Sequence, residues 1–395
     1  MSGAFIAFLA VILFVAVFTR DSYAFILLYL FSGAFLFGRW WVNRIAANIS
    51  YERKFEKRVF PGEKIRVDLK IKNNSRLPAI WLHVQESLPL EISTNKILRQ
   101  VFSLSAKSED TLTYHLSPYK RGYFPVGPLV LSTGDLLGLV QEKIINGESD
   151  YLTVYPRVIP LSRVQLPSNS PLGDLRSSRP IFEDPARPVG KRDYVTGDSL
   201  RRIDWKSTAA VGRLQTRQFE PSIALETVLI LNLNTEEYFY KFRYDASELA
   251  IVVSASLANW LISRKQAAGL VVNGSDPFAD DALPQTHSPR KGRVHMMRML
   301  ETLARVQLVS TRPLAEVLRQ KRAEFSWGTT IIVISGQAED SLFDEFFQMR
   351  RAGLNIVLIL CGDSTGLQNS KARAGKFKIP FFHIRDEKGL DIWRK

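Results

Sequence analysis

The stretch from Arg192 to Glu220 reads RDYVTGDSLRRIDWKSTAAVGRLQTRQFE and lies between two regions with different hydrophobic patterns. Thr196 to Ser199 has the composition of a turn that leads into a helix, because Asp and Ser side chains accept hydrogen bonds from free backbone N–H groups. The spacing then predicts a short helix from Leu200 to Ala209 and a strand from Leu214 to Phe219. This stretch therefore has the order turn, helix, strand.

On the predicted helix, Leu200, Ile203 and Ala210 are expected to face inward, while charged residues surround Trp205. Two interpretations remain open. The polar residues can form an internal network that fixes a connector, with Trp205 as a core anchor, or they can form a surface that binds a partner protein.

The same stretch resembles the signature of the bacterial family called domain of unknown function 58. The resemblance extends upstream to Tyr119–Tyr123, Gly134–Leu139 and Val154–Arg157. The signature residues expected to hold the connector or to bind a partner are Arg192, Tyr194, Gly197, Asp198, Arg202, Asp204, Trp205, Lys206, Arg213 and Phe219.

Length and charge limit the number of domains and the kinds of partner that the chain can have. The 395 residues suggest two or three domains, and the net charge of +14 suits an anionic membrane surface, an acidic protein or nucleic acid. The single cysteine, Cys361, excludes an internal disulfide and a zinc site built from cysteines.

The first 45 residues hold two uncharged apolar runs, Gly3 to Thr19 and Tyr23 to Gly38, separated by a short polar break. Each run is slightly shorter than the roughly 20 residues that usually span a bilayer, but lies near the accepted range. No Lys or Arg precedes the first run, which argues against a cleaved signal peptide. We expect a transmembrane helical hairpin over residues 1–45.

Basic residues follow this hairpin, whereas the loop inside it holds one Arg and one Asp. The positive-inside rule therefore predicts that both ends of the hairpin, and everything after residue 40, lie on the cytoplasmic side of the plasma (inner) membrane. The basic residues are Arg39, Arg44, Arg53, Lys54, Lys57 and Arg58.

Residues 51–157 alternate apolar and polar side chains, most clearly from Ile65 to Lys72, and Gly or Pro separates the alternating runs. This pattern predicts an all-β sandwich. Residues 158–189 lack periodicity and are expected to form a linker, followed by the signature connector at 190–222.

Residues 223–395 alternate buried strands with helices, which predicts a doubly wound, mainly parallel α/β sheet. The family resemblance implies that this sheet is similar to a von Willebrand factor A domain. Domains of that type hold Mg²⁺ through acidic and hydroxyl ligands, but here the matching positions are Asn232, Asn234 and Ser335. Because a hard cation prefers carboxylates, we expect no intact metal site and no cofactor.

The resemblance also implies a partner, because members of this family are commonly associated with MoxR-type AAA+ ATPases. Together with the predicted hairpin, this suggests a non-enzymatic, membrane-anchored scaffold or adaptor that contacts the lipid bilayer and helps to assemble or mature a membrane-associated complex.

Two other function classes stay open. Gly362 to Gly366 is a G-x-S-x-G pattern after a predicted strand, so a membrane-bound hydrolase using Ser364 or Cys361 is one alternative. The polar, basic sequence after it predicts no amphipathic helix there, and no acidic residue lies between Ser364 and His383 to complete a triad. The other alternative, which we expect less, is a basic membrane protein that binds nucleic acid.

Overall fold

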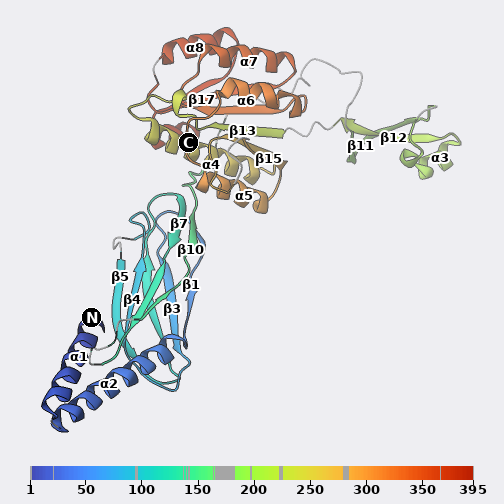
Figure 1. The fold of residues 1–395 in the computed structure, drawn as a ribbon. Helices are drawn as coiled ribbons and strands as arrows, with labels where there is room; N and C mark the ends of the chain where they lie inside the picture. Colours follow the sequence, from blue (N-terminus) through green and yellow to red (C-terminus); the bar gives the residue numbers. More distant parts are fainter. Residues whose placement is uncertain are drawn as a thin grey trace. The chain divides into compact units, whose positions relative to one another are not determined.

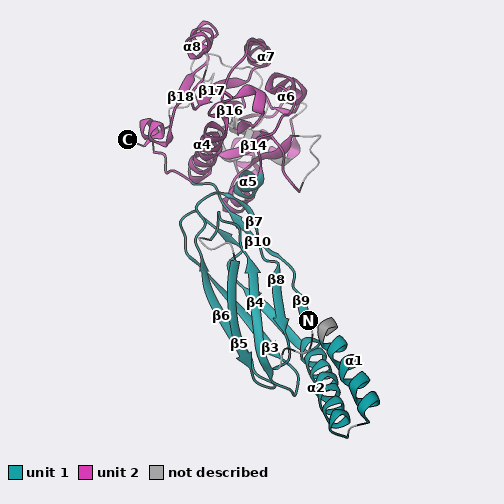
Figure 2. Ribbon diagram, turned by 60° about the vertical axis from the view of Figure 1, so that its left-hand side comes forward, with its two compact units in different colours: residues 1–157, 300–305 teal, residues 158–299, 306–395 magenta. Residues whose placement is uncertain are grey.

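The computed structural model describes residues 2–20, 22–93, 97–136, 138, 140, 143–162, 164, 183–195, 198–221, 226–278, 284–364 and 366–394. The chain divides into two compact units, shown in Figures 1 and 2. Unit 1 comprises residues 1–157 and 300–305, and unit 2 comprises residues 158–299 and 306–395.

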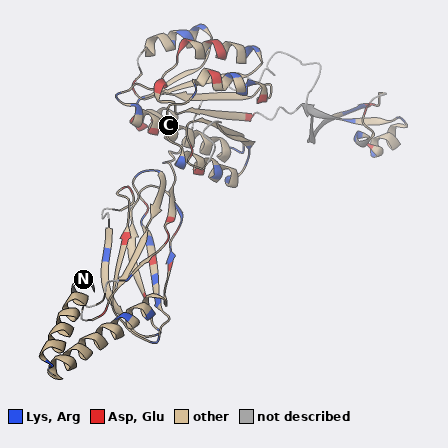
Figure 3. Ribbon diagram, viewed as in Figure 1, with Lys and Arg blue, Asp and Glu red and all other residues tan. Residues whose placement is uncertain are grey.

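Unit 1 begins with two helices, α1 (Ser2–Thr19) and α2 (Ser22–Ala46). Charged residues are absent from α1, and the first in α2 is Arg39, as Figure 3 shows. The helices contact each other through aromatic rings, with the Phe8 and Phe31 centroids 5.6 Å apart.

In length and composition α2 could cross a membrane, whereas the apolar part of α1, Phe5–Thr19, is shorter. In a third apolar helix, α4 (Arg243–Ser263), 78% of the most apolar 18-residue segment is buried, so it is a core helix of unit 2.

The strands of unit 1 form three sheets around one core. The strand orders are β1-β3-β6, β2-β10-β7 and β5-β4-β8-β9, and every pair is antiparallel except β10 with β2. Strand β3 buries Ile65, Val67, Leu69 and Ile71 and turns its charged residues outward, as the alternation predicts. The bounds are β1 (Ile49–Lys54), β2 (Arg58–Val59), β3 (Ile65–Asn73), β4 (Ala79–Ser87), β5 (Ile97–Leu104), β6 (Glu109–Leu116), β7 (Gly122–Val126), β8 (Leu129–Thr133), β9 (Lys143–Asn146) and β10 (Asp150–Val154).

A buried polar cluster joins all three sheets. The Arg53 guanidinium on β1 donates to Glu86 on β4 at 2.8 Å and to Asp150 on β10 at 2.7 Å. Tyr114 on β6 also donates to Glu86. The side chains of Arg53 and Glu86 are 1% and 0% exposed, so this ion pair lies inside the core.

Unit 2 contains a small hairpin module, which we define as the described residues from 183 to 221. Strands β11 (Glu183–Asp193) and β12 (Gln215–Pro221) are antiparallel, and between them lie η2 (Leu200–Arg202) and α3 (Trp205–Val211). Strand β11 begins inside the stretch 158–189, which was expected to be a linker. The sequence did not predict this strand because Pro185 and Pro188 interrupt the usual strand pattern. Most of that expected linker, residues 165–182, lies outside the described residues.

The rest of unit 2 is a six-stranded sheet with the order β15-β14-β13-β16-β17-β18. All neighbouring strands are parallel except β14 and β15. The strand bounds are β13 (Glu226–Asn232), β14 (Ala267–Asn273), β15 (Gln285–Arg290), β16 (Thr330–Ser335), β17 (Asn355–Cys361) and β18 (Phe381–Ile384). The remaining helices are η3 (Thr235–Glu237), α5 (Arg293–Arg305), α6 (Leu314–Lys321), η4 (Arg322–Glu324), α7 (Asp340–Arg351), α8 (Leu367–Lys376) and η5 (Glu387–Trp393).

Helices cover both faces of this sheet. One face packs against α6, α7 and α8, through residues such as Leu318, Phe343 and Ala374, and α4 packs on the other face (Figure 1). From β13 the chain winds outward to β14, and later from β16 to β17 and β18 in the opposite direction. The carboxyl ends of β13 and β16 therefore flank the point where the winding reverses, which is where open α/β sheets usually bind ligands.

Two elements of this sheet were not expected. Helix α8 follows Gly366, where the polar, basic sequence predicted no amphipathic helix, and β15 is an edge strand of sequence QTHSPR. Neither shows a strong pattern, because both bury little apolar surface. In α8 the buried residues are Ser370 and Ala374.

Candidate functional site

Asp204 organises the hairpin module. Its carboxylate caps α3 by accepting from the Ser207 N–H at 3.1 Å, and it also contacts Lys191 Nζ and Arg217 Nε, each at 3.2 Å. The Ser207 N–H and then the Lys191 ammonium lower the pKa of Asp204 to about 2. The helix ends at Gly212, whose φ of 72° is the left-handed conformation that glycine adopts most readily.

A second ion pair fixes the turn before this helix. Arg192 Nη2 lies 2.7 Å from Asp198 Oδ1, and the other Asp198 oxygen accepts from the Val195 N–H at 3.1 Å. The Tyr194 N–H donates to the Leu214 carbonyl at 2.9 Å, and the Tyr194 side chain is half-buried. The signature thus brings Arg192, Tyr194, Asp198 and Asp204 into one module.

The remaining signature residues lie elsewhere on the module or outside the described residues. Arg202, Lys206 and Arg213 are exposed. Phe219 pairs with Pro188 in the β11–β12 ladder, but its side chain lies outside the described residues, as does all of Gly197.

Apolar side chains of the hairpin module are exposed, which corrects part of the sequence prediction. Trp205 is 68% exposed and is not a core anchor, and Leu200 is 67% exposed. Ala210 also faces solvent, whereas Ile203 is buried as expected. Helical spacing cannot reveal whether a second layer covers a face, and no such layer appears among the described residues of this module. The exposed large apolar residues are Val195, Leu200, Trp205, Val211 and Leu214.

A second polar site lies at the carboxyl ends of β13, β14 and β16. The Asn232 amide donates to Glu237 Oε2 at 2.6 Å and to Ser335 Oγ at 2.9 Å. Its oxygen accepts from the Asn234 N–H at 3.2 Å and from Asn273 Nδ2 at 2.9 Å. Each of these five residues is buried, and Asn232 is 0% exposed.

Two further residues close this cluster. The Glu237 carboxylate accepts from the Leu314 N–H, at the start of α6, at 3.1 Å, and burial raises the pKa of Glu237. The Tyr238 hydroxyl donates to the Asn232 carbonyl at 2.6 Å. A Cβ at Gly336 would lie 2.3 Å from the Tyr238 ring, so glycine is needed there.

These contacts do not fit a magnesium ion. The oxygen atoms of Asn232, Asn234 and Glu237 accept hydrogen bonds from N–H groups, which occupy the directions that a cation would need. The described residues contain no cluster of three or more His, Cys, Asp or Glu side chains suited to a metal ion. The site is an amide network built around one buried carboxyl group.

The possible nucleophiles lie at the end of β17. Cys361 is 0% exposed, and burial raises its pKa, which disfavours the reactive thiolate. Ser364 lies in the loop before α8, and His383 Nε2 contacts the Gly362 carbonyl at 2.8 Å. A Cβ at Gly362 would lie 2.5 Å from Ala246, so close packing accounts for this glycine without catalysis.

Sequence reasoning missed Glu237, Tyr238 and Asn273. Their positions at or beyond the ends of buried strands were the available signal, because such positions meet at one edge of a parallel sheet. Asn232 and Ser335 are 103 residues apart, so the contacts themselves could not be read from spacing.

The chain is similar to uncharacterized proteins of bacteria. It is 25% identical over 288 residues to the uncharacterized protein YeaD of Bacillus subtilis, which covers 71% of this chain and 68% of that protein. It is 30% identical over 122 residues to the uncharacterized protein Rv1480 of Mycobacterium tuberculosis, covering 30% of this chain and 36% of that protein.

Solved structures are more distant. Proximal thread matrix protein 1 from the mussel byssus aligns with 43% of this chain and 46% of its own, with 9% identity and a TM-score of 0.32. The CARDB domain of the PF1109 protein from Pyrococcus furiosus aligns with 27% of this chain and 91% of its own, with 18% identity and a TM-score of 0.21. These scores are too low to support any conclusion about function.

The family match covers the region in which both candidate sites lie. Residues 190–355 match the model described as "Protein of unknown function DUF58", and this range holds most of the hairpin module and the amide network. Together with the relative from Bacillus subtilis, this match shows that residues 190–355 of the chain belong to the DUF58 family.

Proposed function

We propose that this protein is a non-enzymatic, membrane-anchored scaffold or adaptor that binds a partner protein through its hairpin module. The observation that carries the proposal is the exposure of Trp205 and Leu200 on a module in which Asp198 and Asp204 are already paired with Arg or Lys. Trp and Arg are among the residues that dominate the binding energy of protein interfaces, and exposed apolar side chains that lie together are typical of interaction sites.

The charges of the module indicate what kind of surface would bind it. Asp198 and Asp204 are paired with Arg or Lys within the module, while Lys206 and Arg213 are exposed at its surface. An acidic surface with an apolar pocket would therefore complement it.

Anchoring of this scaffold in the inner membrane is supported by the apolar, exposed helix α2 and its neighbour α1. The basic residues that follow α2 favour a cytoplasmic location for both units. In this proposal unit 1 is a β-sandwich spacer, and the six-stranded sheet is a von Willebrand factor A-like domain without a metal ion.

A MoxR-type AAA+ ATPase is the partner that we propose. This part rests on the family resemblance of the Arg192–Glu220 signature, and an ATPase would supply the nucleotide chemistry for assembly of a membrane complex. The partner surface defined above is what such an ATPase would need to present.

Photo-crosslinking in intact membranes tests the proposal directly. A photoreactive amino acid at position 205 or 206 of the full chain is expected to capture one predominant protein, identified by mass spectrometry. Trp205→Ser in a chain labelled at position 206 should abolish the capture. Trp327→Ser is the matched control, because Trp327 is also exposed (53%) but lies outside the module.

Two outcomes would contradict the proposal. Capture that survives Trp205→Ser would show that the hairpin module is not the contact surface. Capture of neither an ATPase nor a membrane protein would argue against the assembly role.

A further inference from the structure

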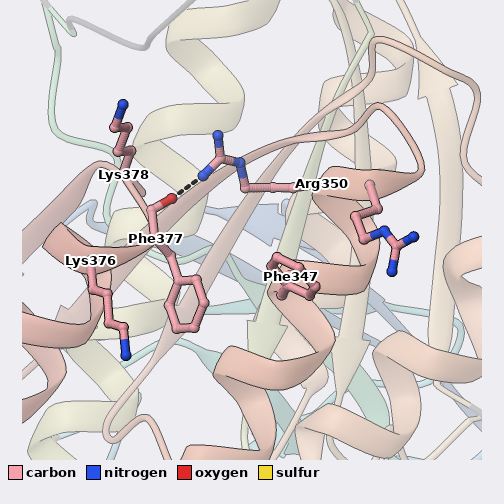
Figure 4. Close-up of a pocket in the computed structure, with 6 residues that line it drawn as sticks. Phe347, Arg350, Lys376, Phe377 and Lys378 are labelled. Atoms are coloured by element: carbon pink, nitrogen blue, oxygen red, sulfur yellow. Dashed lines mark hydrogen bonds between the residues drawn. The ribbon is translucent and has the colours of Figure 1, made fainter.

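A basic pocket lies between the last turns of α7 and α8, near the edge of the sheet where β17 and β18 begin (Figure 4). It has a volume of about 360 Å³. This is the sheet edge opposite the amide network, which lies where the strands end. The residues that line the pocket are Phe347, Arg350, Arg351, Lys376, Phe377 and Lys378.

Two phenylalanine rings form the apolar wall of the pocket. The Phe347 and Phe377 centroids are 6.1 Å apart with planes at 52°, and Phe377 also stacks on the buried Phe343 ring at 6.4 Å. Phe377 is thus held by the core, whereas Phe347 is 45% exposed and available to a ligand. The tilt between the rings suits a single apolar side chain better than the parallel stacking that nucleobases require.

The charged residues of the pocket are all cations. No carboxylate in the described part of the chain lies within the 4.0 Å ion-pair distance of Arg350, Arg351, Lys376 or Lys378. Arg350 donates to the Phe377 carbonyl, and the Arg351 guanidinium lies 5.9 Å from the Phe347 centroid. These cations are therefore available to an anionic ligand.

The interaction of cations with the C-terminal ends of helices explains three of these residues but not the fourth. Arg350 and Arg351 lie in the last turn of α7 and Lys376 in the last turn of α8, where they offset the partial negative charge of the helix ends. Lys378 lies beyond the end of α8 and has a φ of 51°, a left-handed conformation in which glycine is the usual residue. An exposed ammonium group stands there in place of glycine.

We propose that this pocket binds an acidic segment of a partner protein, in which an apolar side chain flanked by carboxylates fills the space beside Phe347. The apolar side chain would pack on the two rings, and the carboxylates would pair with the surrounding cations. The proposal goes beyond the hairpin module and does not depend on it, so Trp205→Ser should leave binding at this pocket unchanged.

The test uses the full chain in uncharged detergent and a fluorescein-labelled peptide of sequence Glu-Asp-Leu-Phe-Asp-Glu, with binding followed by fluorescence anisotropy. Phe347→Ser should weaken binding about tenfold or more, as loss of an aromatic contact at an interface does. Lys378→Gly should weaken binding about threefold, since one exposed ion pair is lost. It removes the ammonium group while supplying the residue that its backbone conformation favours.

Lys265→Gly is the matched control, because Lys265 also has a positive φ (60°) and follows a helix, α4, away from the pocket. This variant should bind the peptide as the parent chain does. Unchanged thermal unfolding of all three variants would show that they are folded.

Three results would overturn the proposal. One is a peptide of glutamates alone that binds as tightly, since the phenylalanine rings would then play no part. Another is equal binding to Phe347→Ser and the parent chain. The third is displacement of the peptide by oligothymidylate at a lower concentration than by unlabelled peptide, which would make the pocket a nucleic-acid site.

Discussion

Replacing Asn232 by Asp tests whether the amide network is a structural site and not a cation site. The substitution changes almost no volume, but it removes the amide group that donates to Glu237 Oε2 at 2.6 Å and to Ser335 Oγ at 2.9 Å. The new carboxyl would face the Glu237 carboxyl in a buried environment. If a cation belonged at this position, the same change would instead improve the site.

The cost of Asn232→Asp follows from this geometry. Two charges at the 2.6 Å separation would repel by about 6 kcal/mol at an effective dielectric constant of about 20. The folded pair therefore takes up a proton, which also restores a hydrogen-bond donor between the two groups. Holding a proton three pH units above an ordinary carboxyl pKa of about 4 costs about 4 kcal/mol, so we expect this loss of stability at pH 7.

The loss should depend on pH in one direction. Because the pair has a raised pKa in the folded state, its stability is fully present below the pKa of the unfolded chain and decreases as the pH rises towards the folded value. As the pH is lowered from 7, the loss in free energy of unfolding relative to the parent chain should shrink by about 1.4 kcal/mol per pH unit and become small near pH 4.

Urea unfolding of unit 2 in the full chain, followed by pulse proteolysis, measures this effect. With a slope of about 2 kcal/mol per molar urea, the midpoint should fall by about 2 M at pH 7. Asn355→Asp is the control, because Asn355 Nδ2 donates to the Gly328 carbonyl, a neutral backbone group, and not to a carboxylate. The reasoning is refuted if Asn232→Asp shows no pH-dependent loss, or if millimolar Mg²⁺ stabilises the parent chain.

Three further predictions concern other parts of the molecule. The Ser207 N–H and Lys191 lower the pKa of Asp204 to about 2, so the stability that its carboxylate gives to the hairpin module should persist at neutral pH and be lost as the pH falls from about 4 through 2. Asp204→Asn should therefore increase hydrogen exchange at the Ser207 amide at pH 7. Glu86→Gln leaves the buried Arg53 guanidinium without its main partner and should cost about 3–5 kcal/mol in urea unfolding, whereas the triple variant Arg53→Met, Glu86→Leu and Tyr114→Phe, which also removes the Tyr114 hydroxyl, should recover most of that loss. Cys361, which is fully buried, should react with a maleimide in denaturant and not in the native chain, and native labelling would contradict the assigned burial.

Local pattern predicted much of the secondary structure. The alternation from Ile65 to Lys72 and the apolar runs of β13, β16 and β17 gave strands close to their observed bounds, because in each the pattern records which sides are buried. The sequence QTHSPR of β15 has no apolar pattern, since this strand lies at an edge of the sheet with half of its side chains exposed.

The sites were harder to predict than the elements. Asn232, Asn234 and Ser335 were found through a family resemblance, but Glu237 was not, because its partner Leu314 is 77 residues away. On the hairpin module, the inward face assigned to Leu200 assumed a covering layer that hydrophobic spacing cannot reveal. Contacts between distant segments, and the absence of a contact in the described module, are both tertiary properties.

Helix α2 has a mechanical consequence. Its first part exposes apolar side chains, yet Val42 and Ile45, further along the same unbroken helix, are each 1% exposed, and Ile45 belongs to the core of unit 1. The apolar part of α2 and the β strands of unit 1 are therefore joined by one continuous helix, whose last part packs into the β core, and not by a flexible linker. A force or rotation applied to the β strands of unit 1 would act directly on the apolar part of α2.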